Sequence, residues 1–516
     1  MKRDGKIRKA GWFGAAVALS AVIVCPGRVG AQSAPSAAEL RREVAELKLK
    51  VEHLEAENQQ LKELSRQVNA LSGRLGVQEE TAKRSEEAAK RSAEAYEQTK
   101  EVSQKLPIVR ADSEGFFIRS HDDTYQLRVG GYVQADGDFY LSQTKPTGSQ
   151  FLMRRVRPFL EGTVAEYYDF RFMEDFGQGT SVLQDAYTDI HYWPEFRIRV
   201  GKFKEPVGLE RLEEARNLKF VERALTVDLV PNRDLGAEFW GDLLSHRVEY
   251  EAGVFNGVPD NTASVDSDNN DAKEFDGRIF LHPFAETSLQ FAEKLGLGIA
   301  GTYGDERGST IDSYKTTGQF TFFTYNQPPS KQPKGVTVLS TVAAGPRYRY
   351  TPQLNYYWGP FGLLAEYVEN SQKLYGGEVP AIKKPPLITD HTLSNQAWQV
   401  ATTYLLTGEN ASYGEVRPRS DFRPFGGSGA WELAARIDRL TIDRDAFKYD
   451  LASPSTSSLE ATEFALGVNW YLNRNVKWMV DYEHTGFRYG NTPTKTGGNR
   501  DRPDESAILS EVQFQF

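Results

Sequence analysis

The sequence predicts an all-β fold, a 16-stranded antiparallel transmembrane β-barrel that follows an N-terminal α-helical coiled coil. Three observations carry this prediction. The hydrophobic period changes from 3.5 residues to 2 near residue 112, the chain stops on an aromatic residue, Phe516, and no apolar run after the first 30 residues is long enough to cross a bilayer as a helix. The expected parts are a signal peptide at 1-31, a periplasmic coiled coil at 32-106 and a barrel at 107-516.

The N-terminus has the three parts of a secretory signal. Basic residues between Lys2 and Lys9 precede an apolar stretch from Gly11 to Val24, and Val29-Gly30-Ala31 supplies small residues for cleavage after Ala31. A lipoprotein signal is the alternative, but it needs small residues before Cys25, where bulky ones stand. Cleavage removes this single cysteine, so we expect a mature chain without disulfides or thiol catalysis, suited to an oxidising compartment.

A heptad repeat follows the signal. From Leu40 to Leu75, seam positions recur at alternating spacings of four and three residues. Most of them are apolar, and the residues around them are rich in Glu, Lys, Arg and Gln. The a positions include Val44, Val51 and Asn58. β-branched a positions with Leu at d and one Asn at a favour a two-stranded coil, and a lone solvated helix is the alternative. We expect the helix to continue to about Gln104 and to stop at Pro107.

Apolar and polar residues alternate in the rest of the chain. The last strand shows this best, because Val512, Phe514 and Phe516 alternate with polar residues, and a terminal strand ending in Phe is typical of bacterial outer-membrane barrels. In a bilayer each strand needs one apolar face and the sheet must close, so the polar faces are expected to line a wet lumen. The sixteen strands are predicted near 124-141, 153-167, 168-176, 181-193, 195-205, 233-243, 244-256, 272-284, 293-304, 341-357, 361-370, 393-407, 430-442, 459-473, 474-487 and 505-516.

The excess of acidic over basic residues lies in the predicted barrel. Residues 32 to 111 contain 14 basic and 14 acidic residues, and residues 112 to 516 contain 42 basic against 56 acidic residues. An acidic domain argues against nucleic acid as a partner, because phosphate backbones bind to basic surfaces. The acidic run at 266 to 271 resembles a calcium loop but lacks its closing Gly and Glu, so a solvated loop is the preferred interpretation. No nucleophile motif, cofactor motif or metal-ligand spacing is present, so we expect neither an enzyme nor a bound cofactor or metal.

Several stretches, in order over roughly 115 to 516, resemble the phosphate-selective porin O and P family. They are Met153-Arg154-Arg155-Val156-Arg157-Pro158, Gln184-Asp185-Ala186-Tyr187, Val200-Gly201-Lys202-Phe203-Lys204-Glu205-Pro206, Gly208-Leu209-Glu210-Arg211-Leu212, Phe220-Val221-Glu222-Arg223-Ala224-Leu225, Arg233-Asp234-Leu235-Gly236, Val254-Phe255-Asn256-Gly257, Tyr356-Tyr357-Trp358-Gly359-Pro360-Phe361, Leu406-Thr407-Gly408-Glu409 and Gly429-Ala430-Trp431-Glu432-Leu433-Ala434-Ala435-Arg436. The resemblance implies a homotrimeric outer-membrane porin, whereas the heptad residues favour a dimer. It also implies a loop folded into the lumen, for which 206 to 232 is the candidate because it is long and still carries apolar residues.

Strand parity and this loop give the candidate pore-lining residues. They are Arg128, Arg155, Arg157, Arg197, Arg199, Arg211, Arg216, Lys219, Arg223 and Arg436. Guanidinium groups in a narrow pore would favour anions such as phosphate. The alternative is that acids on neighbouring strands pair with these arginines, which then only stiffen the wall.

The expected function is a water-filled channel for passive diffusion of small hydrophilic solutes, with a preference for anions. The alternative is a structural anchor, in which the barrel sits in outer-membrane lipid and tethers the coiled coil to the cell wall. A channel conducts ions in planar bilayers and a sealed anchor does not.

Overall fold

The computed structural model describes residues 36–112, 115–141, 148–263, 271–311, 313–327, 338–379, 390–490, 492–493 and 499–516. The predicted signal peptide at 1-31 lies outside the described residues. The chain divides into two compact units, Met1–Lys100 and Glu101–Phe516.

A single long helix, α1 (Ala37–Lys105), accounts for most of the predicted coiled-coil segment. Glu39 caps its start, since its carboxylate accepts hydrogen bonds from the backbone N–H and the hydroxyl of Ser36. The seam residues Leu47 and Leu54 are 60% and 62% exposed in the single chain, so no described residue covers the apolar seam at these positions. Pairing with another helix remains a prediction. No helix among the described residues is both long and apolar enough to span a membrane.

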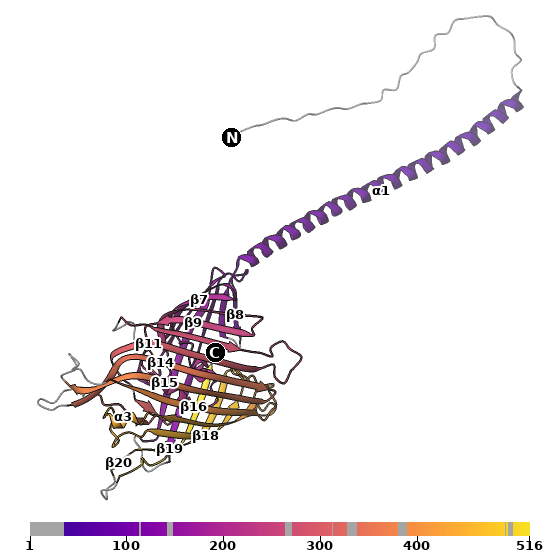
Figure 1. The fold of residues 1–516 in the computed structure, drawn as a ribbon. Helices are drawn as coiled ribbons and strands as arrows, with labels where there is room; N and C mark the ends of the chain where they lie inside the picture. The colour runs from indigo at the N-terminus through magenta and orange to yellow at the C-terminus, as the bar shows by residue number, and fades with distance from the viewer. Residues whose placement is uncertain are drawn as a thin grey trace. The chain divides into compact units, whose positions relative to one another are not determined.

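Sixteen antiparallel strands form a closed sheet, as predicted (Figure 1). Each strand pairs with the next along the chain, and the last one, β22, pairs with the first, β3, so the ring has no free edge. The strands are β3 (Gln126–Tyr140), β4 (Gln150–Val164), β5 (Tyr168–Asp175), β6 (Val182–Trp193), β7 (Phe196–Phe203), β8 (Asp234–Leu243), β9 (Val248–Phe255), β10 (Glu274–Leu281), β11 (Leu295–Thr310), β14 (Val338–Trp358), β15 (Phe361–Val379), β16 (His391–Leu405), β17 (Ala430–Thr441), β18 (Glu460–Tyr471), β19 (Val476–Arg488) and β22 (Glu505–Gln515).

The sequence did not predict a hairpin that precedes the ring. Its strands, β1 (Ile108–Asp112) and β2 (Gly115–Arg119), are five residues each, too short for a clear alternation. β2 pairs with β3 at Phe116↔Val129, and β22 pairs with the same edge of β3 from Gln515↔Tyr132 onward. The hairpin therefore extends the sheet beyond the chain end at Phe516.

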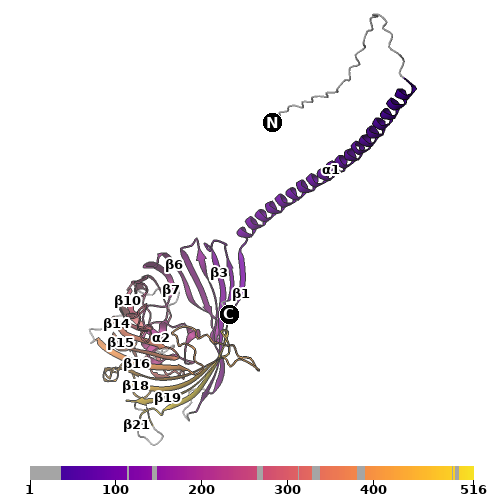
Figure 2. The same ribbon diagram turned by 90° about the vertical axis from the view of Figure 1, so that its right-hand side faces the viewer.

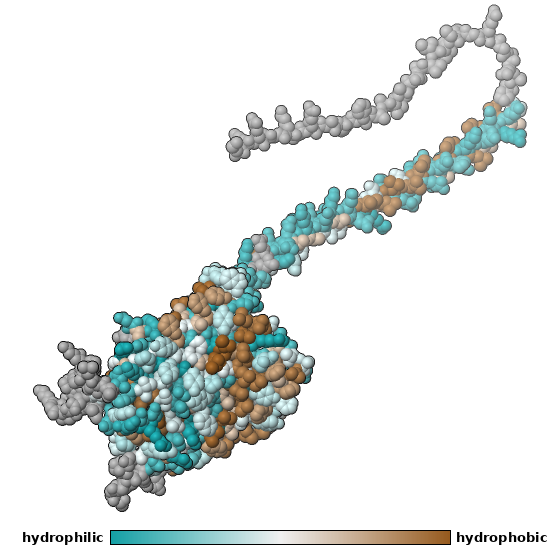
Figure 3. Space-filling view, in the orientation of Figure 1, coloured by the Kyte–Doolittle hydropathy of each residue, from teal (hydrophilic) through white to brown (hydrophobic). Residues whose placement is uncertain are grey.

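The ring strands expose their apolar side chains and bury their polar ones. On β18, Phe464, Leu466 and Val468 are 40 to 48% exposed, whereas Glu463 and Asn469 on the other face are at most 1% exposed. Figure 3 shows hydrophobic residues gathered on part of the barrel surface. This is the reverse of a water-soluble fold and fits a wall whose outer face meets lipid.

Three connections turn back toward the barrel interior, where α2 is visible in Figure 2. They are residues 206–232 between β7 and β8, 313–327 between β11 and β14, and 406–429 between β16 and β17. The first two pack together, since Leu225 and Leu229 share a buried apolar cluster with Phe322 and Phe323. Short elements occur in the connections: η1 (Gly177–Gly179), β12 (Tyr314–Lys315), β13 (Thr321–Phe323), α3 (Asp445–Lys448), β20 (Thr492–Pro493) and β21 (Asn499–Arg500).

A substitution at Gly201 tests how closely β6 and β7 pack against each other. Its φ is +135°, and an added Cβ would lie 2.2 Å from the carbonyl oxygen of Ala186. We expect Gly201→Ala to destabilise the barrel by on the order of 1–3 kcal/mol or more, seen as a lower temperature of heat-induced unfolding in detergent. Gly277→Ala is the matched control on β10, where the nearest atom would be 3.9 Å away. Equal unfolding temperatures for the two variants would contradict the prediction.

Candidate functional site

Residues 206 to 232, here called the inner segment, leave the end of β7 and cross the barrel interior. Gly208 permits the first turn, because its φ is +79° and an added Cβ would lie 3.0 Å from Val230. The segment then forms three short helices, α2 (Leu209–Leu212), η2 (Ala215–Asn217) and η3 (Leu225–Leu229). Its apolar side chains, including Leu218, are buried.

Buried polar groups of the barrel wall hold the backbone of the inner segment. Carboxylates on three wall strands accept from its N–H groups: Leu209 to Glu366 at 2.5 Å, Val221 to Asp481 at 2.6 Å and Leu225 to Asp438 at 3.4 Å. Wall side chains donate to its carbonyl oxygens: Arg436 to Glu222 at 2.9 Å, Asn469 to Lys219 at 2.9 Å and Lys477 to Leu218 at 3.0 Å. These bonds satisfy backbone groups that would otherwise be buried without partners.

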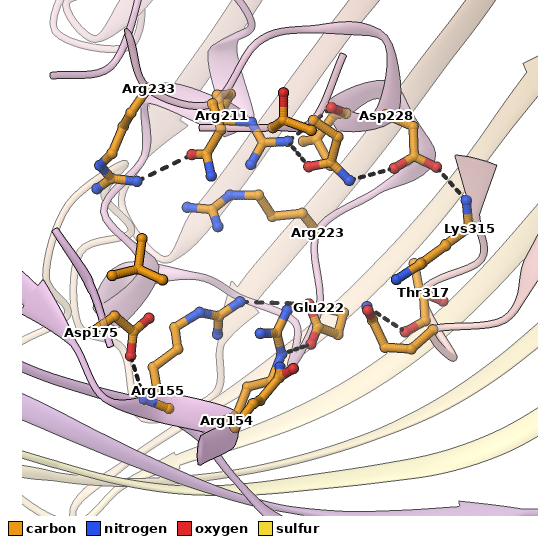
Figure 4. A pocket seen from close by; sticks show the side chains of 18 of the residues that line it. Arg154, Arg155, Asp175, Arg211, Glu222, Arg223, Asp228, Arg233, Lys315 and Thr317 are labelled. Carbon is orange, nitrogen blue, oxygen red and sulfur yellow. Dashed lines mark hydrogen bonds and ion pairs between the residues drawn. The ribbon is translucent and has the colours of Figure 1, made fainter. Parts of the chain in front are cut away.

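A polar cavity of about 580 Å³ lies beside the inner segment (Figure 4). Seven basic and four acidic side chains line it, so it carries a positive excess although the chain as a whole is acidic. The basic residues are Arg154, Arg155, Arg157, Arg211, Arg223, Arg233 and Lys315, and the acidic ones are Asp175, Glu222, Asp228 and Asp260.

One side of the cavity is a pair of adjacent arginines on β4. The β3–β4 register shifts so that Gln134 pairs with Arg155 and Ala135 pairs with Met153, which leaves Arg154 as the extra residue of a β-bulge. The bulge lets both arginines reach the same carboxylate: Arg154 forms an ion pair with Glu222, and an Arg155 nitrogen lies 3.5 Å from it. Glu222 thus offsets part of this charge, and a Glu511 oxygen on β22 lies 3.9 Å from Arg155.

The inner segment contributes two arginines to the cavity. Arg211 donates to the carbonyl oxygen of Val227 at 2.8 Å and to the side-chain oxygen of Asn261. Arg223 donates to the carbonyl oxygens of Glu210 at 3.2 Å and Glu213 at 2.7 Å, and Figure 4 shows it between the other labelled arginines. Among the ion pairs of the described residues, none includes Arg211 or Arg223. Their side chains are oriented without a contacting carboxylate, although Glu210, Glu213 and Asp228 lie near enough to act on their charges.

Asp228 lies on the same wall of the cavity. Its carboxylate accepts from the backbone N–H of Lys315 at 2.9 Å and from the amide of Asn261 at 2.8 Å. Burial raises the pKa of Asp228 to about 7, against the opposing effects of the Lys315 hydrogen bond and the nearby Arg211. The net charge of the cavity therefore changes near neutral pH.

Three other predicted residues, Arg128, Arg197 and Arg199, line a second cavity of about 440 Å³. Arg128 pairs with Glu161 at 2.7 Å and Arg199 with Asp189 at 2.9 Å, whereas Arg197 stacks over the ring of Trp240 at 4.5 Å. Pairing with neighbouring acids, the alternative considered from the sequence, thus holds for two of the three.

The remaining predicted residues are placed differently. Arg155, Arg157, Arg211 and Arg223 line the first cavity, while Arg216 and Lys219 line a small crevice between the inner segment and the wall. Arg157 pairs with Asp175 at 2.7 Å. Arg436 was predicted to line the pore, and the structure places it elsewhere. It faces inward, but the inner segment covers it and its side chain is 0% exposed. Asp438 and Glu463 both pair with it at 2.9 Å. It supports the segment and does not meet solute.

Three lining cations were missed in the sequence. Arg154 points inward only because of the bulge. Arg233 directly precedes β8, at the end of a predicted strand, and Lys315 comes from a connection, where strand parity says nothing. Arg233 pairs with Asp185 at 2.6 Å. The one available signal was the cluster of three arginines at 154, 155 and 157, which is dense for a single strand.

Comparisons with known proteins agree with this architecture. The family model for phosphate-selective porin O and P matches residues 127–516. Porin O of Pseudomonas aeruginosa is 23% identical over 432 residues, which cover 79% of this chain and 92% of that protein.

Solved porin structures are more distant. OmpT of Vibrio cholerae is 10% identical and covers 76% of this chain and 98% of its own, with a TM-score of 0.46. The outer-membrane channel DcaP of Acinetobacter baumannii is 11% identical and covers 79% and 99%, with a TM-score of 0.46. The anion-selective porin from Comamonas acidovorans is 9% identical and covers 76% and 100%, with a TM-score of 0.44.

The family match extends over most of the chain and includes all sixteen ring strands except the first residue of β3. Together with the closed barrel, it confirms the family that the sequence motifs indicated. This chain belongs to the phosphate-selective porin O and P family and is an outer-membrane porin.

Proposed function

We propose that this porin passes small hydrophilic solutes by passive diffusion, without catalysis, and prefers anions, with phosphate as the oxyanion best suited to the cavity. The observation that carries the proposal is the pair Arg211 and Arg223, whose hydrogen bonds go to neutral oxygens. A guanidinium held by carbonyl groups has a defined orientation and no carboxylate in direct contact with it. In a narrow, partly dehydrated site such groups attract and hydrogen-bond oxyanions.

The acidic composition of the chain does not oppose this proposal. Many of its carboxylates are buried in the wall, where they accept hydrogen bonds from the inner segment or pair with arginines such as Arg436. What a passing ion meets is the local excess of basic groups in the cavity. Selectivity follows the charges near the ion path, because the field of a distant charge is screened by salt.

The first prediction concerns selectivity. In planar bilayers with a KCl gradient, the reversal potential of the wild-type protein should have the sign that indicates a higher permeability for Cl⁻ than for K⁺. Added phosphate should reduce the chloride current. Arg211→Gln combined with Arg223→Gln should lower the anion-to-cation permeability ratio several-fold, because both charges are removed from the cavity.

Two controls separate charge from structure. Arg223→Lys keeps the charge and should retain anion preference, and Arg307→Gln removes an exposed arginine that pairs with Asp305 outside the cavity lining and should change nothing. A cation-selective wild-type channel would contradict the proposal, and a barrel without conductance would favour the anchor alternative.

The second prediction is a pH dependence. Since the pKa of Asp228 is about 7, its carboxyl is mostly charged at pH 8 and mostly neutral at pH 6. The cavity is then more positive at pH 6, so the anion preference should increase as the pH falls from 8 to 6. Asp228→Asn should have the stronger preference at both pH values. A variant that keeps the full pH dependence would show that another group is responsible.

The remaining parts of the chain complete the proposal. Residues 1-31 act as the signal peptide, the outward apolar faces contact outer-membrane lipid, and α1 stands in the periplasm as a coiled coil, where it is available for contact with the cell wall. We propose a homotrimer, in which the exposed seam of α1 packs against the same seam in the other copies. The heptad residues alone favour a two-helix coil, so contacts between the barrels have to set the number of subunits at three.

The third prediction tests this packing in the full-length protein. Val44→Asp with Val51→Asp places charges at two a positions and should weaken the oligomer, because those side chains would be buried between helices. Leu49→Asp with Ala56→Asp is the matched control at f positions, on the solvent face of the coil. Native mass spectrometry in detergent measures the number of subunits and their dissociation. Equal dissociation of the two variants would favour the solvated-helix alternative.

A further inference from the structure

Three buried carboxyl groups meet where the inner segment leaves the wall. Glu205 follows β7 and directly precedes the inner segment, and Glu274 and Asp276 project from β10. Each offers a carboxylate oxygen, and these oxygens all lie within 4.8 Å of one another. The three residues are 1%, 0% and 5% exposed. They are outside the lining of the basic cavity.

The nearby arginines do not neutralise this cluster. Arg347 pairs with Glu274 and, at 3.2 Å, with Glu306. Arg349 pairs with Glu274 at 2.5 Å and with Asp260 at 2.6 Å. These three carboxylates already outnumber the two guanidinium groups, before Glu205 and Asp276 are added.

Apart from each other, Glu205 and Asp276 have no hydrogen-bonding group next to them among the described residues. Both carboxylate oxygens of each residue are buried and lack a hydrogen-bond partner among the residues that the structure describes. A buried carboxylate without a donor or counter-charge is strongly unfavourable. Two such carboxylates, each with an oxygen within 4.8 Å of the other and of a Glu274 oxygen, need either protons or a bound cation.

The chemistry of the donors selects the cation. All three ligands are carboxylate oxygens, with no sulfur or imidazole nitrogen, which suits hard divalent ions and not zinc or copper. Ca²⁺ accepts an irregular set of carboxylates completed by water, whereas Mg²⁺ demands near-ideal octahedral geometry.

We infer that Glu205, Glu274 and Asp276 bind one Ca²⁺ ion, which ties the root of the inner segment to β10. The ion adds two positive charges where five carboxylates face two arginines. It also fixes the residue from which the segment enters the lumen, so its loss loosens the segment at that end. This inference does not depend on the proposed anion preference.

The test is calcium binding by the full-length porin in detergent after treatment with a chelator. Titration calorimetry with CaCl₂ should show a saturable site, with one ion per chain, and the temperature of heat-induced unfolding should be higher in Ca²⁺ than in EDTA. Glu205→Gln with Asp276→Asn keeps the side-chain shapes and should remove both effects.

Glu432→Gln is the matched control. It also removes a buried carboxyl with one unpartnered oxygen, but on β17, and it should bind Ca²⁺ like the wild type. Circular dichroism in EDTA confirms that each variant is folded. Absence of a saturable site in the wild type, or Ca²⁺ binding that survives the double substitution, overturns the inference and leaves shared protons as the explanation.

Discussion

The hydrogen bonds between the inner segment and the barrel wall position the charges that the segment brings to the basic cavity. A segment that crosses a lumen has no neighbouring strand to hydrogen-bond its backbone N–H and C=O groups. Here side chains of the wall form these hydrogen bonds, one backbone group at a time. Glu366, for example, accepts from the N–H of Leu209 and from the hydroxyl of Thr226. Because these acceptors belong to rigid strands, the arginines of the segment are placed with the precision of the wall.

This arrangement also explains how an acidic barrel can contain a basic cavity. The carboxylates that hold the segment lie on β15, β17 and β19, on the wall that the segment covers. They accept hydrogen bonds from its backbone N–H groups. The arginines of β4 and of the segment's free side face the cavity instead. Net charge is therefore a poor guide to the interior of a barrel, since the segment divides the acids from most of the bases.

Much of the fold could be predicted from the sequence, and the site only in part. Alternation located all sixteen ring strands because lipid outside and water inside impose opposite demands on the two faces of each strand. Parity gives the face of a residue, but it cannot tell whether a connection covers that face, which is why Arg436 was misplaced. It also fails where a bulge adds a residue, as at Arg154, and in connections, as at Lys315. Such features depend on tertiary contacts that no local pattern records.

The inner segment is supported from a second direction by the connection between β16 and β17. Residues 406–429 join β16 and β17 at the end of the barrel where the other links are mostly short, and their length serves a structural purpose. The hydroxyl of Tyr413 donates to the carbonyl oxygen of Leu209, and Lys219 donates to the carbonyl oxygen of Gly414 at 3.1 Å. A segment held by the wall along its length and by this connection at its turns cannot shift without breaking several buried hydrogen bonds at once. The spacing of the cavity arginines is therefore set by the fold and not by the passing solute, which is the condition for a pore that selects by charge placement.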